Sequence, residues 1–266
     1  MCQNDLLEQV YKIGEMELEL TRFNAKRAFG KIDRNLELKK IGNCTLLFET
    51  TSPNSIYFNR IRGFGMKDLD KLEYILDLYN KKNIIPCFDM APNNINKEVA
   101  LALFKHGFGT SEQLVFMQLM PEIYDDLIKT IKIVEVTKKN AGEFVKIVMR
   151  SNGNMEIDEK IIARKKPYFY KPCFHNYICY IGNEVAGIGS LFISGKEGYI
   201  ANDYTVERFR GNGIQKKLLM YRINIAKELG LEKLYTDVEF GSISHNNMEK
   251  LGFKTVFINS FWTKLH

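Results

Sequence analysis

The hydrophobic positions arrange most of the chain into two stretches with the same order of elements. Apolar residues recur at helical spacing over 67–82 and again over 214–229, and a Gly-rich turn precedes each helix. A short apolar run, a second helix closed by Gly-Phe and a run of β-branched and aromatic residues follow in both places. The order strand, turn, helix, strand, helix and strand is therefore predicted twice.

Two landmarks indicate an internal repeat. The Gly-rich turns begin at Arg62 and Arg210, and the Gly-Phe pairs begin at Gly107 and Gly252, so both landmarks recur after about 145 residues. Outside the repeated order, apolar residues at helical spacing near the N-terminus predict a helix, followed by a polar segment. Strand-like runs lie at 45–48 and 55–61 before the first turn, and a hairpin is predicted over Gly182-Asn183 before the second.

The second Gly-rich turn, from Arg210 to Gln215, carries the clearest chemical signal. The first turn of a helix has unpaired N–H groups and partial positive charge, and glycine lets a phosphate approach the backbone closely. No Lys-Ser/Thr follows, as a P-loop requires, and Lys216 stands where a dinucleotide-binding turn has its third glycine. The turn is therefore predicted to hold a diphosphate in another way.

The turn is similar to the acetyl-CoA loop of the GNAT superfamily of acyl-CoA N-acyltransferases, Gln/Arg-x-x-Gly-x-Gly/Ala. Arg210 and Gly213 match it, while Gln215 replaces the usual small residue. Lys-Leu-Gly-Phe at 250–253 also resembles this superfamily, and the resemblance covers 131–266. The first stretch looks like a degenerate copy, because Phe64 lies between its glycines and Asp68 and Asp70 would repel a phosphate.

The resemblance implies an α/β (α+β) fold of two GNAT-like units, each a mixed, mainly antiparallel twisted sheet flanked by helices. The expected domains are 1–125, degenerate, and 126–266, an intact acetyltransferase unit. In such a unit the diphosphate would lie on Arg210, Gly211, Asn212, Gly213, Ile214, Gln215 and Lys216. Backbone N–H groups around Thr205 and Val206 would polarise the thioester carbonyl. Tyr168, Phe169 and Tyr170 would line the acceptor site or fill core.

The catalytic acid and base are harder to place. Asp203 is the acidic side chain best placed to deprotonate an amine, since it precedes Thr205 by two residues on the predicted strand, although a structural role or an ordered water as base remains open. The superfamily often has a tyrosine four residues before the Gly of Gly-Phe, where this chain has Met248. Ser244 is the nearest hydroxyl, His245 is another candidate acid, and the thiolate could also leave unaided.

Two functions follow from these residues. The first is an acetyl-CoA-dependent N-acetyltransferase that passes an acetyl group directly to a primary amine of a small molecule or peptide. The second is a catalytically weak or inactive acyl-CoA-binding or sensing module, which Met248 and the degenerate first unit favour. A different phosphate-ligand protein is a third, weaker reading.

Composition narrows the remaining choices. The net charge of +6 comes from scattered basic residues without aromatic interleaving, so no nucleic-acid partner is expected. No apolar run is long enough to span a bilayer and the N-terminus does not resemble a signal peptide, so no membrane partner and a cytoplasmic location are expected. Cys173, His175 and Cys179 lack a fourth ligand, so no metal is expected. Either a monomer or a homodimer is compatible with the sequence.

Overall fold

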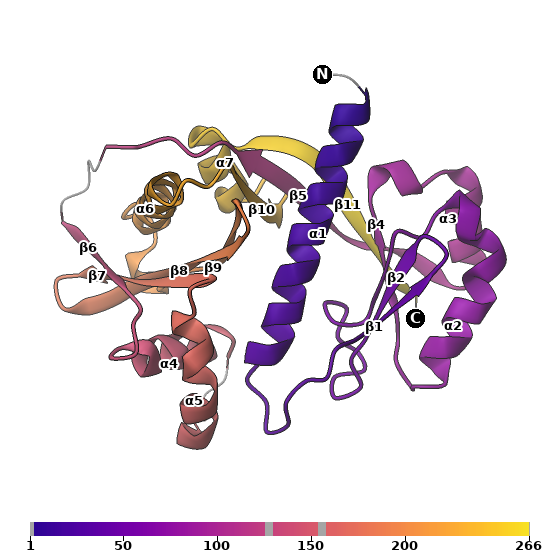
Figure 1. Cartoon of the computed structure of the whole chain (residues 1–266), viewed down its shortest axis with the longest axis horizontal. Coiled ribbons are helices and arrows are strands. Elements are labelled where there is room, and N and C mark those ends of the chain that lie inside the picture. The colour runs from indigo at the N-terminus through magenta and orange to yellow at the C-terminus, as the bar shows by residue number, and fades with distance from the viewer. Residues whose placement is uncertain (1–2, 126–129, 154–157, 266) are drawn as a thin grey trace.

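The strands of both halves of the chain join in one continuous sheet (Figure 1). The computed structural model describes residues 3–125, 130–153 and 158–265. In this part of the chain the sheet has 11 strands in the order β1-β2-β3-β4-β11-β5-β10-β9-β8-β7-β6. Among the strand pairs of the described residues, only β3 with β4 and β9 with β10 run parallel. The predicted mainly antiparallel sheet with flanking helices is confirmed.

The strands and helices have the following bounds. The strands are β1 Glu37–Ile41, β2 Cys44–Phe48, β3 Arg60–Arg62, β4 Cys87–Met90, β5 Phe108–Leu119, β6 Ile131–Glu135, β7 Phe174–Ile181, β8 Glu184–Ser194, β9 Glu197–Thr205, β10 Lys233–Glu239 and β11 Lys254–Lys264. The α-helices are α1 Gln3–Arg27, α2 Leu72–Asn80, α3 Lys97–Lys105, α4 Ala141–Ser151, α5 Glu159–Lys165, α6 Ile214–Glu228 and α7 Ile243–Lys250.

The last strand of each half lies inside the other half's part of the sheet. Strand β5, from the N-terminal half, pairs with β10 on one side and β11 on the other. Strand β11, from the C-terminal half, lies between β4 and β5. The two halves therefore complete each other's hydrogen-bond ladders. The predicted boundary between 125 and 126 falls between β5 and β6, and it stays a prediction.

Helix α1 covers the middle of one face of this sheet (Figure 1). Its buried residues Ile13, Met16 and Leu20 pack in one cluster with side chains of both halves, among them Phe116, Tyr199 and Tyr235. Helix α6 covers the opposite face, because Ile200 and Leu234, the strand neighbours of Tyr199 and Tyr235, pack with Leu219 and Ile223 of α6. The helix predicted near the N-terminus is therefore α1, which extends to Arg27 because Met16 and Leu20 continue its buried stripe beyond Ile13.

Two element predictions in the N-terminal half were only partly right. The run at 55–61 forms a strand only at Arg60–Arg62, since the Asn59 side chain binds Glu49 N and Ser52 O and holds the preceding residues in turns. The helix predicted over 67–82 begins as a 3-10 turn at Met66–Lys71, where Asp68 is buried. Between the two halves, the sequence predicts a linking helix or loop over 122–130, and part of this range lies outside the described residues.

Candidate active site

Strands β9 and β10 separate part-way along their length and leave a wedge between them. Their parallel pairing covers only Lys233 with Glu197, Leu234 with Gly198, and Tyr235 with Tyr199. Beyond Tyr199 the strand β9 pairs only with β8, and beyond Tyr235 the strand β10 pairs only with β5 in the described part of the chain. A cavity of about 460 Å³ lies here, lined by residues 199–203 of β9, 236–239 of β10, and parts of α1 and α7.

The Gly-rich turn ends at the N-terminus of α6 with its amide groups free. Gly211 and Gly213 have φ values of 82° and 75°, which side-chain-bearing residues rarely adopt. The first intrahelical bond of α6 runs from Lys217 N to Gly213 O at 2.9 Å, and no side chain caps the helix. The N–H groups of Ile214, Gln215 and Lys216 are thus available to an anion, beside the exposed side chains of Arg210 and Lys216.

A bulge in β9 turns Asp203 away from the α1 face. The register with β8 shifts between Ser190–Ala201 and Ile188–Tyr204, and Asn202 has a φ of 53°. Ala201 and Tyr204 pack in the cluster under α1. The Asp203 carboxylate instead accepts a hydrogen bond from Arg222 of α6.

Asp203 pairs with a fully buried arginine. The Arg222 side chain is 0% exposed and also donates to Ser190 O at 2.9 Å. Burial raises the pKa of Asp203, and the Arg222 charge opposes that rise. Asp203 is therefore the counterion of a buried arginine, an arrangement that disfavours the general-base role predicted for it.

Two backbone N–H groups, those of Thr205 and Val206, are predicted to polarise the thioester. The structure leaves one of them without a hydrogen bond to β8. Val206 N donates to Ala186 O at 3.0 Å, so this group is already used. Gly187 and Thr205 are then a non-hydrogen-bonded pair of the antiparallel ladder. The N–H of Thr205 points away from β8, toward the side on which the wedge opens.

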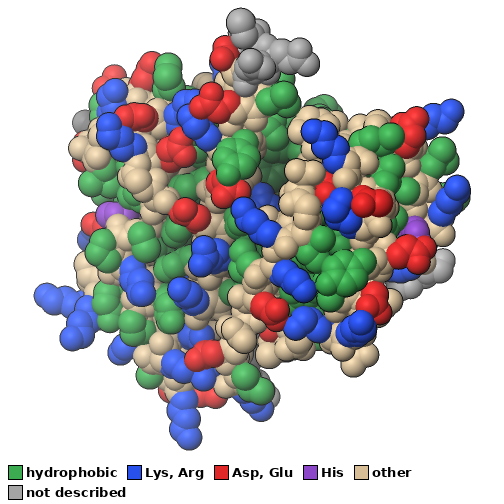
Figure 2. Space-filling model, turned by 45° about the vertical axis from the view of Figure 1, so that its right-hand side comes forward, with side chains coloured by type: hydrophobic (Ala, Val, Ile, Leu, Met, Phe, Trp, Pro, Cys, Tyr) green, Lys and Arg blue, Asp and Glu red, His purple; other side chains and the backbone are tan. Residues whose placement is uncertain are grey.

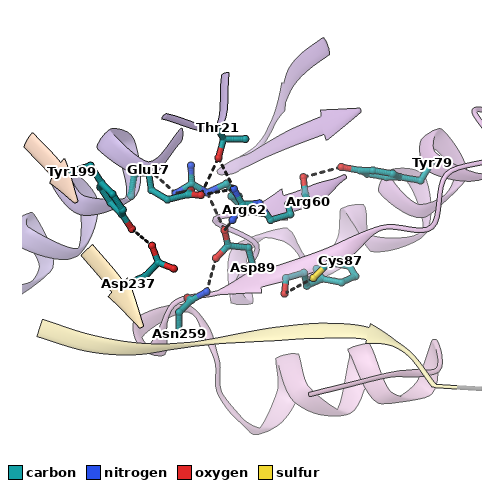
Figure 3. Close-up of polar contacts among 12 residues, drawn as sticks. Glu17, Thr21, Arg60, Arg62, Tyr79, Cys87, Asp89, Tyr199, Asp237 and Asn259 are labelled. Carbon is teal, nitrogen blue, oxygen red and sulfur yellow. Dashed lines mark hydrogen bonds and ion pairs between the residues drawn. The ribbon is translucent and has the colours of Figure 1, made fainter. Parts of the chain in front are cut away.

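Strand β10 brings two carboxylates to the wedge that the sequence analysis did not select. Tyr235, Asp237 and Glu239 alternate along the strand, so they share the α1 face, and both acidic residues line the cavity. The Tyr199 hydroxyl donates to Asp237 at 2.5 Å (Figure 3). The alternation of acidic residues after Tyr235 was visible in the sequence, but nothing in it showed that β10 leaves β9 at that point.

The comparisons with known proteins agree with this geometry. Residues 143–253 match the family model described as "Acetyltransferase (GNAT) family". This segment belongs to the GNAT family. No curated protein matches the chain.

Several solved structures are similar to this chain over both of its halves, and not over the GNAT segment alone. A GCN5-related N-acetyltransferase from Kribbella flavida has a TM-score of 0.66 at 13% identity and covers 87% of this chain and 90% of its own. A tandem GNAT protein from the clavulanic acid biosynthesis pathway has a TM-score of 0.56 at 11% identity, covering 94% of both chains. A conserved protein of unknown function from Staphylococcus epidermidis has a TM-score of 0.63 at 13% identity, covering 88% and 96%. The whole chain thus has a tandem GNAT fold.

In the GNAT segment, Gln215 links the turn to α7. Its Nε2 donates to Ser244 Oγ at 2.9 Å, and its Oε1 accepts from Asn247 Nδ2 at 2.7 Å. Ser244 also lines the cavity, so one side chain couples the anion cradle to the candidate acid. Met248 lines the cavity too and has no acidic proton. His245 accepts from Gly241 N at 3.0 Å through Nδ1, which fixes its ring at the start of α7.

The equivalent turn of the N-terminal half has a different use. Asp68 is 1% exposed and accepts hydrogen bonds from Asn43 N and Nδ2 at 3.1 and 3.0 Å. Phe64, between the two glycines, is fully buried in the core of this half. A carboxylate is therefore fixed in the first helical turn, where a phosphate would meet like charge.

Metal and membrane features were searched over the described residues. There, no group of three or more His, Cys, Asp or Glu side chains is arranged to hold a metal ion. His175 instead lies 3.1 Å from Glu135 through Nδ1, and Cys179 is buried. No helix in the described part of the chain has the length and apolarity needed to cross a membrane.

Proposed function

We propose that the chain is an acetyl-CoA-dependent N-acetyltransferase that transfers the acetyl group directly to a primary amine of a small molecule or peptide. One observation carries the proposal: the free amides of the α6 N-terminus and the wedge between β9 and β10 belong to one strand-turn-helix unit. The first can hold the diphosphate and the second can admit the pantetheine arm with its thioester. GNAT membership of residues 143–253 supports this assignment.

The reaction needs a polarised carbonyl, a neutral amine and a stabilised leaving thiolate. Thr205 N–H is the backbone donor free to polarise the carbonyl, since it points away from β8. Ser244 is the proposed acid, because its hydroxyl accepts from Gln215 and keeps its own proton to donate. The thiol of free CoA ionises near a pKa of about 8.5, so this assistance need only be modest.

An acyl-CoA-binding or sensing module is the second candidate. Met248, 1% exposed, and the Asp203–Arg222 pair favour it, because they remove two groups expected to transfer protons. Both candidates bind acetyl-CoA, but only the enzyme releases CoA in the presence of an amine. A broad amine panel that gives no CoA release above hydrolysis would therefore favour the binding module.

Substitution of Lys216 by Glu is expected to weaken acetyl-CoA binding at least ~10-fold, measured by calorimetry. The change puts a negative charge beside the proposed diphosphate position, where Lys216 is exposed in the first turn of α6. Protein stability should stay equal or rise by ~0.3–1 kcal/mol, since an acidic group suits a helix N-terminus. Weaker binding therefore cannot come from unfolding.

Lys227→Glu is the matched control, because Lys227 is exposed in the last turn of the same helix. It changes the net charge equally but lies far from the turn. Equal losses of affinity in the two variants would point to a general charge effect and contradict the placement of the diphosphate.

A further inference from the structure

The cavity in the wedge is built by both halves of the chain. One side of the cavity consists of strands β9 and β10 and helix α7. The other side consists of Leu20 and Asn24 of α1, Leu114 of β5, and Tyr57, which lies before β3. Asn24 Nδ2 donates to the Tyr57 hydroxyl at 2.8 Å, which fixes the tyrosine against α1. Acetyl-CoA is proposed to enter from the α6 side. The acceptor must then enter from the opposite side, which residues of the N-terminal half line.

The lining of this cavity is acidic. It includes Asp203, Asp237 and Glu239, and it includes no Lys, Arg or His. Arg222 neutralises Asp203, and Arg27, which does not line the cavity, donates to Asn202 at 3.1 Å. Within the described part of the chain, neither Asp237 nor Glu239 forms an ion pair with Lys or Arg. The wall opposite the thioester thus favours a positively charged ligand.

Of the three carboxylates in this lining, Asp237 is half-buried and, within the described residues, forms no ion pair with Lys or Arg. Burial raises its pKa and nearby Glu17 adds to the rise, whereas the hydrogen bond from Tyr199 and the charge of Arg60 lower it. Figure 3 shows the Tyr199–Asp237 pair beside the cluster of Glu17, Arg60 and Arg62. A carboxylate with a raised pKa takes a proton more readily near neutral pH, and it lies on the α1 side with the acceptor.

We propose that this cavity binds a small cationic primary amine and that Asp237 is the residue that removes the proton from its ammonium group. The inference rests on the proposed acetyl transfer. The ammonium gives one proton to Asp237, and the neutral nitrogen attacks the thioester carbon. The C–N bond forms, the C–S bond breaks, Ser244 gives its proton to the departing sulfur, and the second amine proton restores the Ser244 hydroxyl. Asp237 then releases its proton to solvent.

Asp237→Asn is expected to lower kcat/KM for 1,5-diaminopentane at least ~100-fold, the usual contribution of a general base. The amide can still accept the Tyr199 hydrogen bond, and it removes a charge that burial disfavours, so thermal stability should be unchanged or higher. Acetyl-CoA affinity should change less than ~2-fold in calorimetry. Glu112→Gln, an exposed carboxylate of β5 outside the cavity, is the control and should behave like the wild type.

Tyr199→Phe provides a readout that a purely structural role would not affect. It removes the hydrogen bond that lowers the pKa of Asp237, so the acid limb of the kcat/KM profile should move to higher pH. The variant leaves the other titratable groups around Asp237 unchanged, namely Glu17, Arg60, Tyr57 and Glu239. An acid limb at the wild-type pH would contradict the assignment of that limb to Asp237.

Two amines of equal length test the ligand class. The chain should acetylate 1,5-diaminopentane with a kcat/KM at least ~10-fold above that of 5-aminopentanoate, because the distal ammonium meets the carboxylate wall and the distal carboxylate is repelled. Glu239→Gln should narrow this ratio. An equal or inverted preference in the wild type would overturn the cationic-acceptor assignment.

The outcomes separate this inference from the proposed function. If the wild type binds acetyl-CoA and acetylates amines while Asp237→Asn retains full turnover, the role of Asp237 is wrong and the acetyltransferase stands. If the wild type releases CoA with none of a broad panel of amines, both proposals fail together. Loss of turnover with acetyl-CoA binding intact in Asp237→Asn supports both.

Discussion

Residues 1–125 and 126–266, expressed separately, are each expected to remain unfolded or to aggregate. The N-terminal fragment would lack β11, which fills the space between β4 and β5 and pairs with β5 from Lys254 to Lys264. The C-terminal fragment would lack β5, which pairs with β10 from Leu114 to Leu119. Each fragment would expose long unpaired strand edges and the face that α1 shares between the halves, so neither can complete a core.

Circular dichroism, urea unfolding and size exclusion test this expectation. Co-expression of the two fragments should restore a folded complex, since all the strand pairs are then present. As a control, a protease site inserted between Glu122 and Ile123, both exposed, should allow cleavage of the folded chain while the halves stay together. Cooperative unfolding of either fragment alone would contradict the interdependence of the halves and support two separable domains.

The sequence predicted the elements but not the partners of the last strands. A period of two shows which residues of a strand face the core, and both 113–119 and 255–262 have the strand-forming composition that the sequence analysis used. That pattern does not say which neighbour supplies the hydrogen bonds. The repeat therefore suggested two separate sheets, whereas β5 and β11 are exchanged between the halves.

The candidate site shows a similar limit. Counting two residues placed Asp203 on the face of Thr205, but it could not show which side of the sheet that face is, because the bulge at Asn202 shifts the alternation between Ala201 and Tyr204. A single residue with positive φ thus turns the carboxylate toward α6 and Arg222. The Gly-rich turn was easier to predict, because its glycines act through local backbone conformation, and both have the positive φ that only glycine adopts readily.

Basic and acidic side chains are mixed on the surface. Figure 2 shows Lys and Arg interspersed with Asp and Glu over the visible face. The charges with the largest structural consequence instead lie inside the N-terminal half, between α1 and the strands β3 and β4. They surround Arg60, close to the proposed acceptor cavity (Figure 3).

Arg60→Met is expected to destabilise the full chain by ~3–5 kcal/mol, the usual effect of removing one partner from a buried ionic group. The Arg60 side chain is 2% exposed and donates to Glu17 at 2.7 Å, to Thr21 at 3.0 Å and to Asp89 at 3.2 Å. Methionine fills part of the space but leaves Glu17 facing Arg62 alone, at 3.7 Å. Urea unfolding at neutral pH measures the loss.

The pH dependence of this loss distinguishes charge from packing. Burial alone would raise the pKa of Glu17, but Arg60 and Arg62 outweigh it and hold this pKa below the ordinary value. Glu17 therefore stabilises the fold above the pKa of an unfolded glutamate, about 4.3, and loses that effect as pH falls through its lower folded pKa. Without Arg60 the folded pKa of Glu17 rises, so the difference in stability between wild type and variant should shrink as pH falls from the raised pKa of the variant to the lower one of the wild type.

Arg208→Met is the matched control for this prediction. Arg208 pairs with Glu184 at 3.0 Å, but both side chains are mostly exposed, at 63% and 59%. An exposed pair contributes ~0–1 kcal/mol, so this variant should lose little stability and should show no comparable change at acid pH. A loss at Arg60 that stays constant between neutral and acid pH would show that packing, rather than the buried charges, holds α1 against β3 and β4 at this point.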